Sequence, residues 1–195
     1  MKLYMIRHGQ SQTNLEKRFT GQADAPLTEQ GREDARKAGR LLKDVRFDRI
    51  YSSDLSRAAE TAQIALGQEP IRLEMIRELS VGSLAWRKVA DCEEEYGEEL
   101  WKNRNSYNYK PYGGETEAEL QKRARDFLTM LENDPCETVA AFSHAGFITC
   151  VLTQVLGASF DRKHIACLNG SVSVFAFDGK KWILEQWGMR CPDED

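Results

Sequence analysis

The chain has 195 residues, of which 41% are hydrophobic and 30% charged, which is enough for one sizeable core. Its formal net charge of -4 argues against nucleic acids and anionic membranes as partners, since both attract clusters of Lys and Arg. No apolar run approaches the roughly 18 residues of a membrane-spanning helix. Residues 1–8 are too short and too charged for a signal peptide. We therefore expect a single cytoplasmic domain over residues 1–195.

Short apolar runs alternate with helical patterns along the chain. The strand-like runs cover residues 3–6, 47–51, 138–142 and 172–177. The helical patterns cover residues 28–45, 55–66, 116–131 and 147–156. Such alternation predicts an α/β fold with three layers, α/β/α, around a mostly parallel central sheet. Asp178-Gly179, before a further run at 182–186, predicts a hairpin that adds an antiparallel pair.

Residues 79–114 interrupt this alternation and read as an insertion with an acidic helix around residues 93–101. Two interpretations are open: the acidic side chains form a solvated helix face, or the segment is a lid over an active site. We expect Trp86 and Trp101 in this segment to be packing groups, like Trp182 and Trp187.

Two of the three histidines directly follow strand-like runs. His8 lies in Arg7-His8-Gly9, and His144 lies in Ser143-His144-Ala145-Gly146. Open α/β sheets bind ligands at the carboxyl ends of their strands, so we expect both imidazoles at that edge. The third, His164, has no such company and is expected on the surface.

These residues suit phosphoryl transfer. A neutral imidazole has a free lone pair near pH 7, so His8 can attack phosphorus. Arg7 and Arg57 offer forked N–H donors that match phosphoryl oxygens, and Arg57 lies in the first turn of its helix, where backbone N–H groups also favour an anion. His144, as a cation or a neutral donor, and the backbone N–H of Ala145 would complete the ring of donors.

Further motifs occur in a fixed order with these residues, namely Arg7-His8-Gly9-Gln10-Ser11, Asn14, Arg18-Phe19-Thr20-Gly21, Leu27-Thr28-Glu29-Gln30-Gly31, Ser52-Ser53-Asp54-Leu55-Ser56-Arg57-Ala58-Ala59-Glu60-Thr61-Ala62, Gly113-Gly114-Glu115-Thr116 and Ser143-His144-Ala145-Gly146. This order resembles the histidine phosphatase superfamily, which has the phosphoglycerate mutase-like fold, from residue 3 to about residue 177.

The resemblance implies an enzyme in which His8 is the nucleophile and is transiently phosphorylated. It also implies that Asn14, Thr20 and Gly21 face the phosphate or the substrate. The family takes an acid from the segment after the third strand, and Glu78, four residues before Gly82, is the best match. Its carboxyl would protonate the leaving oxygen and later deprotonate water.

Departures from the family's mutases favour transfer to water. Mutases typically read His-Gly-Asn where this chain has His144-Ala145-Gly146, carry a tyrosine at the place of Val81, and have Arg-Arg where Arg104-Asn105 stands. The chain is also shorter than the typical mutase, which leaves less lid to exclude water. We expect a metal-independent phosphomonoesterase of the histidine acid phosphatase type that hydrolyses a small phosphate ester.

Two alternatives stay open beside the phosphatase. One is phosphoryl transfer of the cofactor-dependent phosphoglycerate mutase type. The other is an inactive binding domain. The retention of both histidines and both arginines speaks against it. The sequence predicts no metal site and no cofactor, and the five cysteines form neither a disulfide framework nor a zinc site. The sequence identifies neither the ester nor the oligomeric state. It also leaves open whether a second anionic group is bound by Arg87, Lys88, Lys102 and Arg104.

Overall fold

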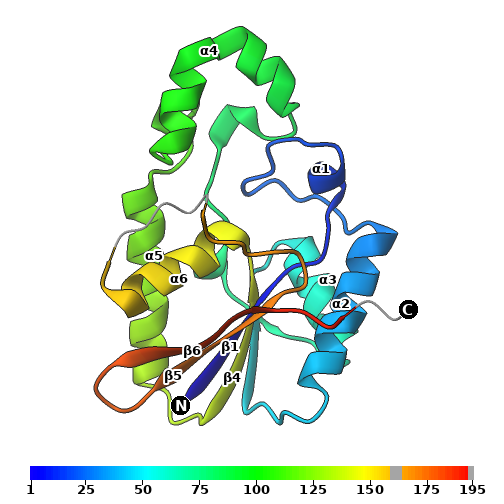
Figure 1. Cartoon of the computed structure of the whole chain (residues 1–195), viewed down its shortest axis with the longest axis vertical. Helices are drawn as coiled ribbons and strands as arrows, with labels where there is room; N and C mark the ends of the chain where they lie inside the picture. The colour runs from blue at the N-terminus through cyan, green and yellow to red at the C-terminus, as the bar shows by residue number, and fades with distance from the viewer. Residues whose placement is uncertain (159–163, 193–195) are drawn as a thin grey trace.

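The computed structural model describes residues 1–158 and 164–192. Within them the elements follow in the order β1 (Lys2–Arg7), α1 (Gln12–Leu15), α2 (Glu29–Leu42), β2 (Arg49–Ser52), α3 (Ser56–Leu66), β3 (Ile71–Arg72), η1 (Glu74–Ile76), η2 (Gly82–Leu84), α4 (Val89–Asn105), η3 (Lys110–Tyr112), α5 (Glu117–Glu132), β4 (Thr138–Ser143), α6 (Ala145–Leu156), β5 (Val172–Phe177) and β6 (Trp182–Met189), where η marks a short 3-10 helix. The predicted alternation of strands and helices is confirmed (Figure 1).

The strands form one sheet in the order β3-β2-β4-β1-β5-β6 across the described residues. The pairs β3-β2, β2-β4 and β4-β1 are parallel, whereas β5 runs antiparallel to both β1 and β6. The predicted hairpin at Asp178-Gly179 joins β5 to β6, with the Asp178 N–H donating to the Lys181 carbonyl at 3.2 Å. The sheet is therefore mostly parallel, as expected, with an antiparallel strand inserted beside β1.

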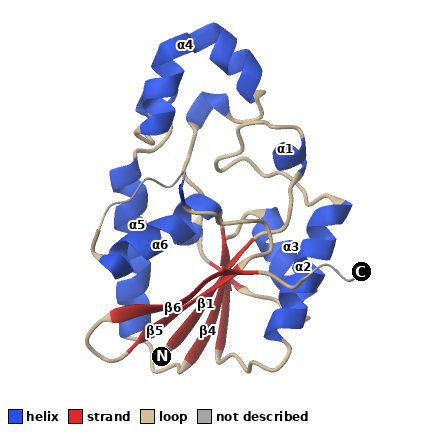
Figure 2. Ribbon diagram, viewed as in Figure 1, coloured by secondary structure: helices blue, strands red, loops and turns tan. Residues whose placement is uncertain are grey.

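Helices cover both faces of the sheet, with α5 and α6 on one side and α2 and α3 on the other (Figure 2). The residues of β4 show why both faces need a cover. Val139 and Ala141 pack in the apolar cluster that includes residues of α5 and α6, while Ala140 and Phe142 pack in the cluster that includes residues of α2 and α3. Successive side chains of a strand point to opposite faces, so the apolar residues of β4 need a cover of helices on both faces of the sheet.

The acidic helix is longer than the predicted residues 93–101 and is bent. It runs over Val89–Asn105, and Gly97 inside it has φ 54° and ψ -128°. Glycine reaches this left-handed φ at no steric cost, so it divides α4 into two arms that arch over one end of the molecule (Figure 1). The charge run alone marked the helix in the sequence, which is why its ends were misplaced.

Two small elements were missed by the sequence pattern. Strand β3 has only two residues, both exposed, and α1 has four, so neither is long enough to show a periodicity. The five cysteines, all of them among the described residues, form no disulfide. In the described part of the chain, no helix combines the length and the apolarity needed to cross a membrane.

Candidate active site

The central strands bring the two predicted histidines together. Strands β1 and β4 are parallel neighbours in which Arg7 stands opposite Ser143, so His8 and His144 leave the sheet side by side. The His8 N–H donates to the Ser143 carbonyl at 3.0 Å, and the centroids of the two imidazole rings are 5.1 Å apart. The expectation that both imidazoles lie at the carboxyl edge of the sheet is confirmed.

Two hydrogen bonds determine which nitrogen of His8 carries its lone pair. Nδ1 lies 2.6 Å from the Gly9 carbonyl oxygen, which can only accept, so Nδ1–H donates. Nε2 lies 3.3 Å from Nε of Arg57, which can only donate, so Nε2 accepts. Burial, followed by the positive charges of Arg57 and Arg7, holds the pKa of His8 well below 6.5. His8 is thus a neutral imidazole with its nucleophilic nitrogen beside a cation.

His144 is fully buried, and neither of its ring nitrogens has a hydrogen-bond partner among the described residues. Burial lowers the pKa of His144 well below 6.5, and the charge of Arg57 adds to that effect. Of the two forms left open by the sequence, the structure therefore favours the neutral one. An unpaired buried imidazole is costly, and an oxygen of a bound anion would satisfy its N–H.

Arg57 enters the site from the first turn of α3, which follows the neighbouring strand β2. Its side chain is 1% exposed, and burial lowers its pKa to about 10, so the guanidinium stays charged at neutral pH. Nη1 donates to the Ala23 carbonyl at 2.7 Å and Nη2 to the Gly21 carbonyl at 2.8 Å. These bonds fix the fork of Arg57 against the loop that follows α1.

Arg7 is the second cation of the site. Its Nη1 donates to the Cys167 carbonyl at 2.6 Å, while Nε is buried with no partner among the residues that the structure describes. Both arginines line the same cavity, which has a volume of about 420 Å³. The structure thus brings both arginines to one cavity, and that they bind an anion there stays a prediction.

The cavity is lined by most of the other predicted site residues. Asn14, Thr20, Gly21 and Glu78 all contribute to its wall, together with Gly146. His144 and Ala145 are not among its lining residues, so the cavity lining supports neither predicted phosphate contact; the His144 ring does lie directly behind the wall, 5.1 Å from that of His8. Ala145 opens α6 and is half-buried.

Glu78 reaches the first turn of α6 with its carboxylate. Oε2 accepts from the Gly146 N–H at 3.1 Å, and Oε1 accepts from the Leu79 N–H at 2.8 Å. A Cβ on residue 146 would lie only 2.1 Å from Oε1 of Glu78. Gly146 therefore leaves the space that this carboxylate occupies.

The outer wall of the cavity is aromatic and comes partly from α4. It contains Phe19, Trp101, Tyr107 and Tyr109. Trp101 is 52% exposed and Trp86 is 44% exposed, so the expectation that both are packing groups was wrong. Both indoles therefore lie at the surface.

The acidic run of α4 is only in part a solvated face. Glu93 accepts from Nη1 of Arg104 at 2.6 Å, and Glu95 is bonded to Nη2 of Arg87. The Arg104 guanidinium also lies over the rings of Phe19 and Trp101, at 5.6 and 5.5 Å from their centroids. Two of the four cations that were candidates for a second anion are thus already paired. Lys88 and Lys102, the other two, are exposed and do not line the cavity.

Three residues that support the site were not predicted to do so, although one of them, Thr61, lies in the motif that contains Arg57. Asn169 donates from Nδ2 to the His8 carbonyl at 2.9 Å, and Oγ1 of Thr61 accepts from the Gly9 N–H at 3.1 Å. Arg123 on α5 donates to the carbonyl of Glu78 at 3.1 Å. None of them follows a strand end, which was the signal that marked the histidines. His164 is exposed, as predicted.

Comparison with known families gives a match over nearly the whole chain. The sequence profile of the histidine phosphatase superfamily (branch 1) matches residues 3–190. A Salmonella paratyphi A protein named probable phosphoglycerate mutase GpmB is 30% identical over 195 residues, which cover 96% of this chain and 90% of that protein.

Solved structures of phosphatases share the fold. The alpha-ribazole phosphatase from Shigella flexneri is 27% identical with a TM-score of 0.88, and 100% of each chain is covered. The mycobacterial glucosyl-3-phosphoglycerate phosphatase is 26% identical with a TM-score of 0.85, covering 96% of this chain and 98% of that one.

Proposed function

Because the chain belongs to the histidine phosphatase superfamily, we propose that it is a phosphomonoesterase that hydrolyses a small phosphate ester through a phosphohistidine at His8. One observation supports this reaction more directly than membership of the superfamily does. Nε2 of His8 bears a lone pair, accepts from Arg57 at 3.3 Å and belongs to a residue on the cavity wall. A phosphoryl group bound there meets a nucleophile and a fixed cation together.

In the first step the phosphate dianion is bound by Arg7 and Arg57, with an N–H of His144 donating to a phosphoryl oxygen. An oxygen of the substrate takes over the Arg57 Nε–H, which frees the lone pair of His8 Nε2. That lone pair forms the N–P bond while the ester O–P bond breaks. The leaving oxygen keeps the bonding pair and takes a proton from the carboxyl of Glu78.

In the second step water attacks the phosphorus of the phosphohistidine. The carboxylate of Glu78 takes a proton from that water, the N–P bond breaks and Nε2 of His8 regains its lone pair. Orthophosphate leaves, and Glu78 is again protonated for the next cycle. One carboxyl group thus serves as acid and then as base, which balances the protons of the cycle.

The charges that stabilise the transferring group come from the chain itself. Arg7 and Arg57 line the cavity with two forks that suit phosphoryl oxygens. We therefore expect activity to persist in EDTA. The lowered pKa of His8 keeps the nucleophile unprotonated into the acidic range, which supports a histidine acid phosphatase type.

Mutase activity, the alternative, is favoured by the name of the Salmonella relative but by little in this site. Arg104, which stands where mutases have an arginine pair, already pairs with Glu93. Gly146, which stands where mutases have an asparagine, is in contact with Glu78 and has no side chain to offer a substrate. Transfer to water is the better fit to these residues.

The test is release of phosphate from a panel of small phosphate esters in EDTA. The panel includes 3-phosphoglycerate, with its 2-isomer quantified beside free phosphate. Phosphate with little isomer is the expected result, and the best ester names the substrate class. Isomer without phosphate would replace the proposal by the mutase, and no turnover of any ester would leave a binding domain.

A further inference from the structure

We propose that Arg123 and Glu115 are positioning residues that hold Glu78 in place for proton transfer. The inference rests on the proposed role of Glu78 as the acid of the phosphatase reaction. Glu115 belongs to the Gly113-Gly114-Glu115-Thr116 motif, to which the reaction itself gives no role. Arg123 lies on α5, two turns beyond the start of that helix.

The backbone around Glu78 needs partners from elsewhere in the fold. Residues 77–81 belong to no helix and no strand. Their N–H and C=O groups therefore lack the regular partners that a helix or a sheet supplies, yet buried polar backbone groups are almost always paired. A loop without such partners would let the Glu78 carboxyl move away from the cavity.

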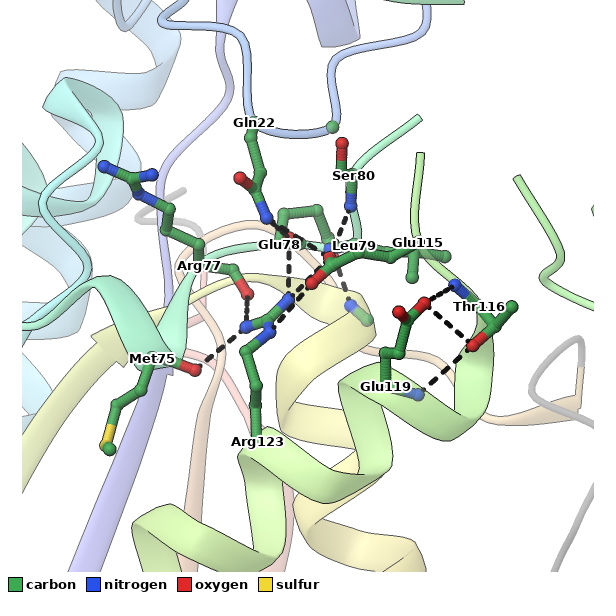
Figure 3. Close-up of polar contacts among 12 residues, drawn as sticks. Gln22, Met75, Arg77, Glu78, Leu79, Ser80, Glu115, Thr116, Glu119 and Arg123 are labelled. Carbon is green, nitrogen blue, oxygen red and sulfur yellow. Dashed lines mark hydrogen bonds and ion pairs between the residues drawn. The ribbon is translucent and has the colours of Figure 1, made fainter. Parts of the chain in front are cut away.

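Arg123 donates to two carbonyls of this segment and to one just before it, and its whole guanidinium takes part in the network (Figure 3). Nη1 donates to the carbonyls of Met75 and Arg77, both at 2.8 Å. Nη2 donates to the carbonyl of Glu78 at 3.1 Å and to Oε2 of Glu115 at 2.8 Å, and Nε donates to Oε1 of Glu115 at 3.1 Å. A guanidinium has five N–H groups, and here each has an acceptor.

Glu115 continues the network on the other side of Glu78. Its Oε2 accepts from the Ser80 N–H at 2.8 Å and from Nε2 of Gln22 at 3.2 Å. The same Gln22 amide donates to the Glu78 carbonyl at 3.1 Å. The carbonyl of Glu78 thus has two donors, and the Arg123–Glu115 pair holds Arg77 before it and Ser80 two residues after it (Figure 3).

Arg123 also contacts the helix that receives the Glu78 side chain. Its guanidinium carbon lies 5.9 Å from the centroid of the Phe147 ring, within the range of a cation–π contact. Phe147 directly follows Gly146, whose N–H binds the Glu78 carboxylate at 3.1 Å. One side chain therefore fixes the loop that carries the acid and packs on the helix turn that orients it.

The start of α5 sets the geometry of this pair. Thr116 caps the helix and forms a reciprocal capping box with Glu119, which fixes the direction in which Glu115 enters (Figure 3). The side chains of Arg123 and Glu115 are only 19% and 22% exposed, so the ion pair is largely buried. Lysine could keep the charge at position 123 but has only three donors on one atom, so it cannot bind all these acceptors.

The experiment compares kcat/KM on two substrates that differ in their need for an acid. p-Nitrophenyl phosphate has a good leaving group and needs little protonation, whereas the best alkyl phosphate of the panel needs a proton. The variants are Arg123→Lys, Arg123→Gln and Glu115→Gln, with Arg125→Gln as the control on an exposed position of the same helix. The result expected is a loss on the alkyl ester about 10-fold or more larger than the loss on p-nitrophenyl phosphate.

A second arm repeats the substitutions in a Glu78→Gln background. If Arg123 and Glu115 act through Glu78, they lower activity little further once the acid is gone. Equal losses on both substrates, or full additivity with Glu78→Gln, would overturn the inference and leave a structural ion pair. Glu115→Gln keeps the size of the side chain, so it carries the test even where Arg123→Gln folds poorly. A wild-type protein that releases no phosphate would instead refute the proposed function.

Discussion

His8 is oriented by contacts that only one of its tautomers can make. The Gly9 carbonyl takes the Nδ1 proton and Arg57 donates to Nε2. The same Arg57 therefore lies beside the proposed nucleophile, and in the proposed mechanism it goes on to bind the phosphoryl group. At this scale the predictions concern single side chains that contact the reacting atoms or each other.

Replacing His8 by alanine removes the nucleophile. We expect kcat to fall by more than about 1,000-fold, as for other covalent nucleophiles. Wild-type protein quenched during turnover of a 32P-labelled ester should carry acid-labile label, and the His8→Ala variant should carry none. Label that survives in the variant would assign the nucleophile to another residue.

Replacing Glu78 by glutamine removes the proton but keeps the shape. We expect a loss of about 100-fold on alkyl phosphates and a much smaller loss on p-nitrophenyl phosphate, whose leaving oxygen needs little protonation. The measurement is kcat/KM on both esters. Equal losses would mean that Glu78 orients the substrate and does not donate a proton.

Gly146→Ala tests the close approach of Glu78. The added Cβ would stand 2.1 Å from Oε1 of Glu78, so the carboxylate has to move, while the backbone does not. We expect activity on alkyl phosphates to fall about 10-fold or more, with a change in unfolding free energy below about 1 kcal/mol. Thermal unfolding beside kcat/KM separates the two. Full activity in the variant would show that the contact has no role in the reaction.

At the scale of elements, α4 stands apart because it belongs to the segment that interrupts the alternation of strands and helices. It contributes Trp101 to the aromatic outer wall, its two arms are joined by the Arg104–Glu93 pair, and Arg104 holds it against the fold by lying over Phe19. The idea that residues 79–114 act as a lid stays a prediction. It leads to a test that uses both members of that pair.

Arg104→Gln should loosen α4 and raise KM about 3- to 10-fold with little change in kcat, because part of the wall is lost and the reacting groups are untouched. Glu93→Gln should have the same effect if Arg104 serves to anchor the helix. A rise in KM only in Arg104→Gln would mean instead that Arg104 binds the substrate. Both variants should unfold near the wild-type temperature, because a partly exposed pair contributes at most about 1 kcal/mol.

The elements that the sequence predicted well are those with a continuous apolar run or a helical pattern. Strand β4 is apolar at successive positions, and the buried residues of α5 recur at helical spacing, so their identity could be inferred. The histidines were found because each follows such a strand. Arg123 could not be found this way, because an arginine on an amphipathic helix is ordinarily a solvated residue and only the tertiary fold places it under Glu78. The break at Gly97 was missed because the acidic run was interpreted as one continuous helix.

For the whole molecule, two buried neutral histidines connect stability to pH. The pKa values of His8 and His144 are both held well below 6.5 by burial. As the pH falls through about 6.5, the unfolded chain binds protons at these residues and the folded chain does not. The unfolded state then holds more protons, so the free energy of unfolding falls as the pH falls.

We expect this loss between about pH 6.5 and pH 4.5, above the range where Asp and Glu titrate. The limiting slope is about 1.4 kcal/mol per pH unit for each histidine. Urea unfolding at several pH values measures it. His144→Gln should reduce the slope, and His164→Gln, at an exposed position, should keep it. A wild-type stability that is flat over this interval would contradict the neutral state of both imidazoles in the fold.

The position of β1 between β4 and β5 also has a consequence for biosynthesis. During translation β1 leaves the ribosome early, but both of its neighbours in the sheet are encoded far downstream. Until residues near 143 and 177 have emerged, His8 therefore lies at the end of an apolar strand that has no partner strands. For much of its synthesis the nascent chain therefore exposes an apolar strand with unpaired edges. The proposed phosphate site forms only when β4 and β5 have paired with β1. Catalytic competence in a translation reaction would then appear late and all at once, as a marker of completed folding.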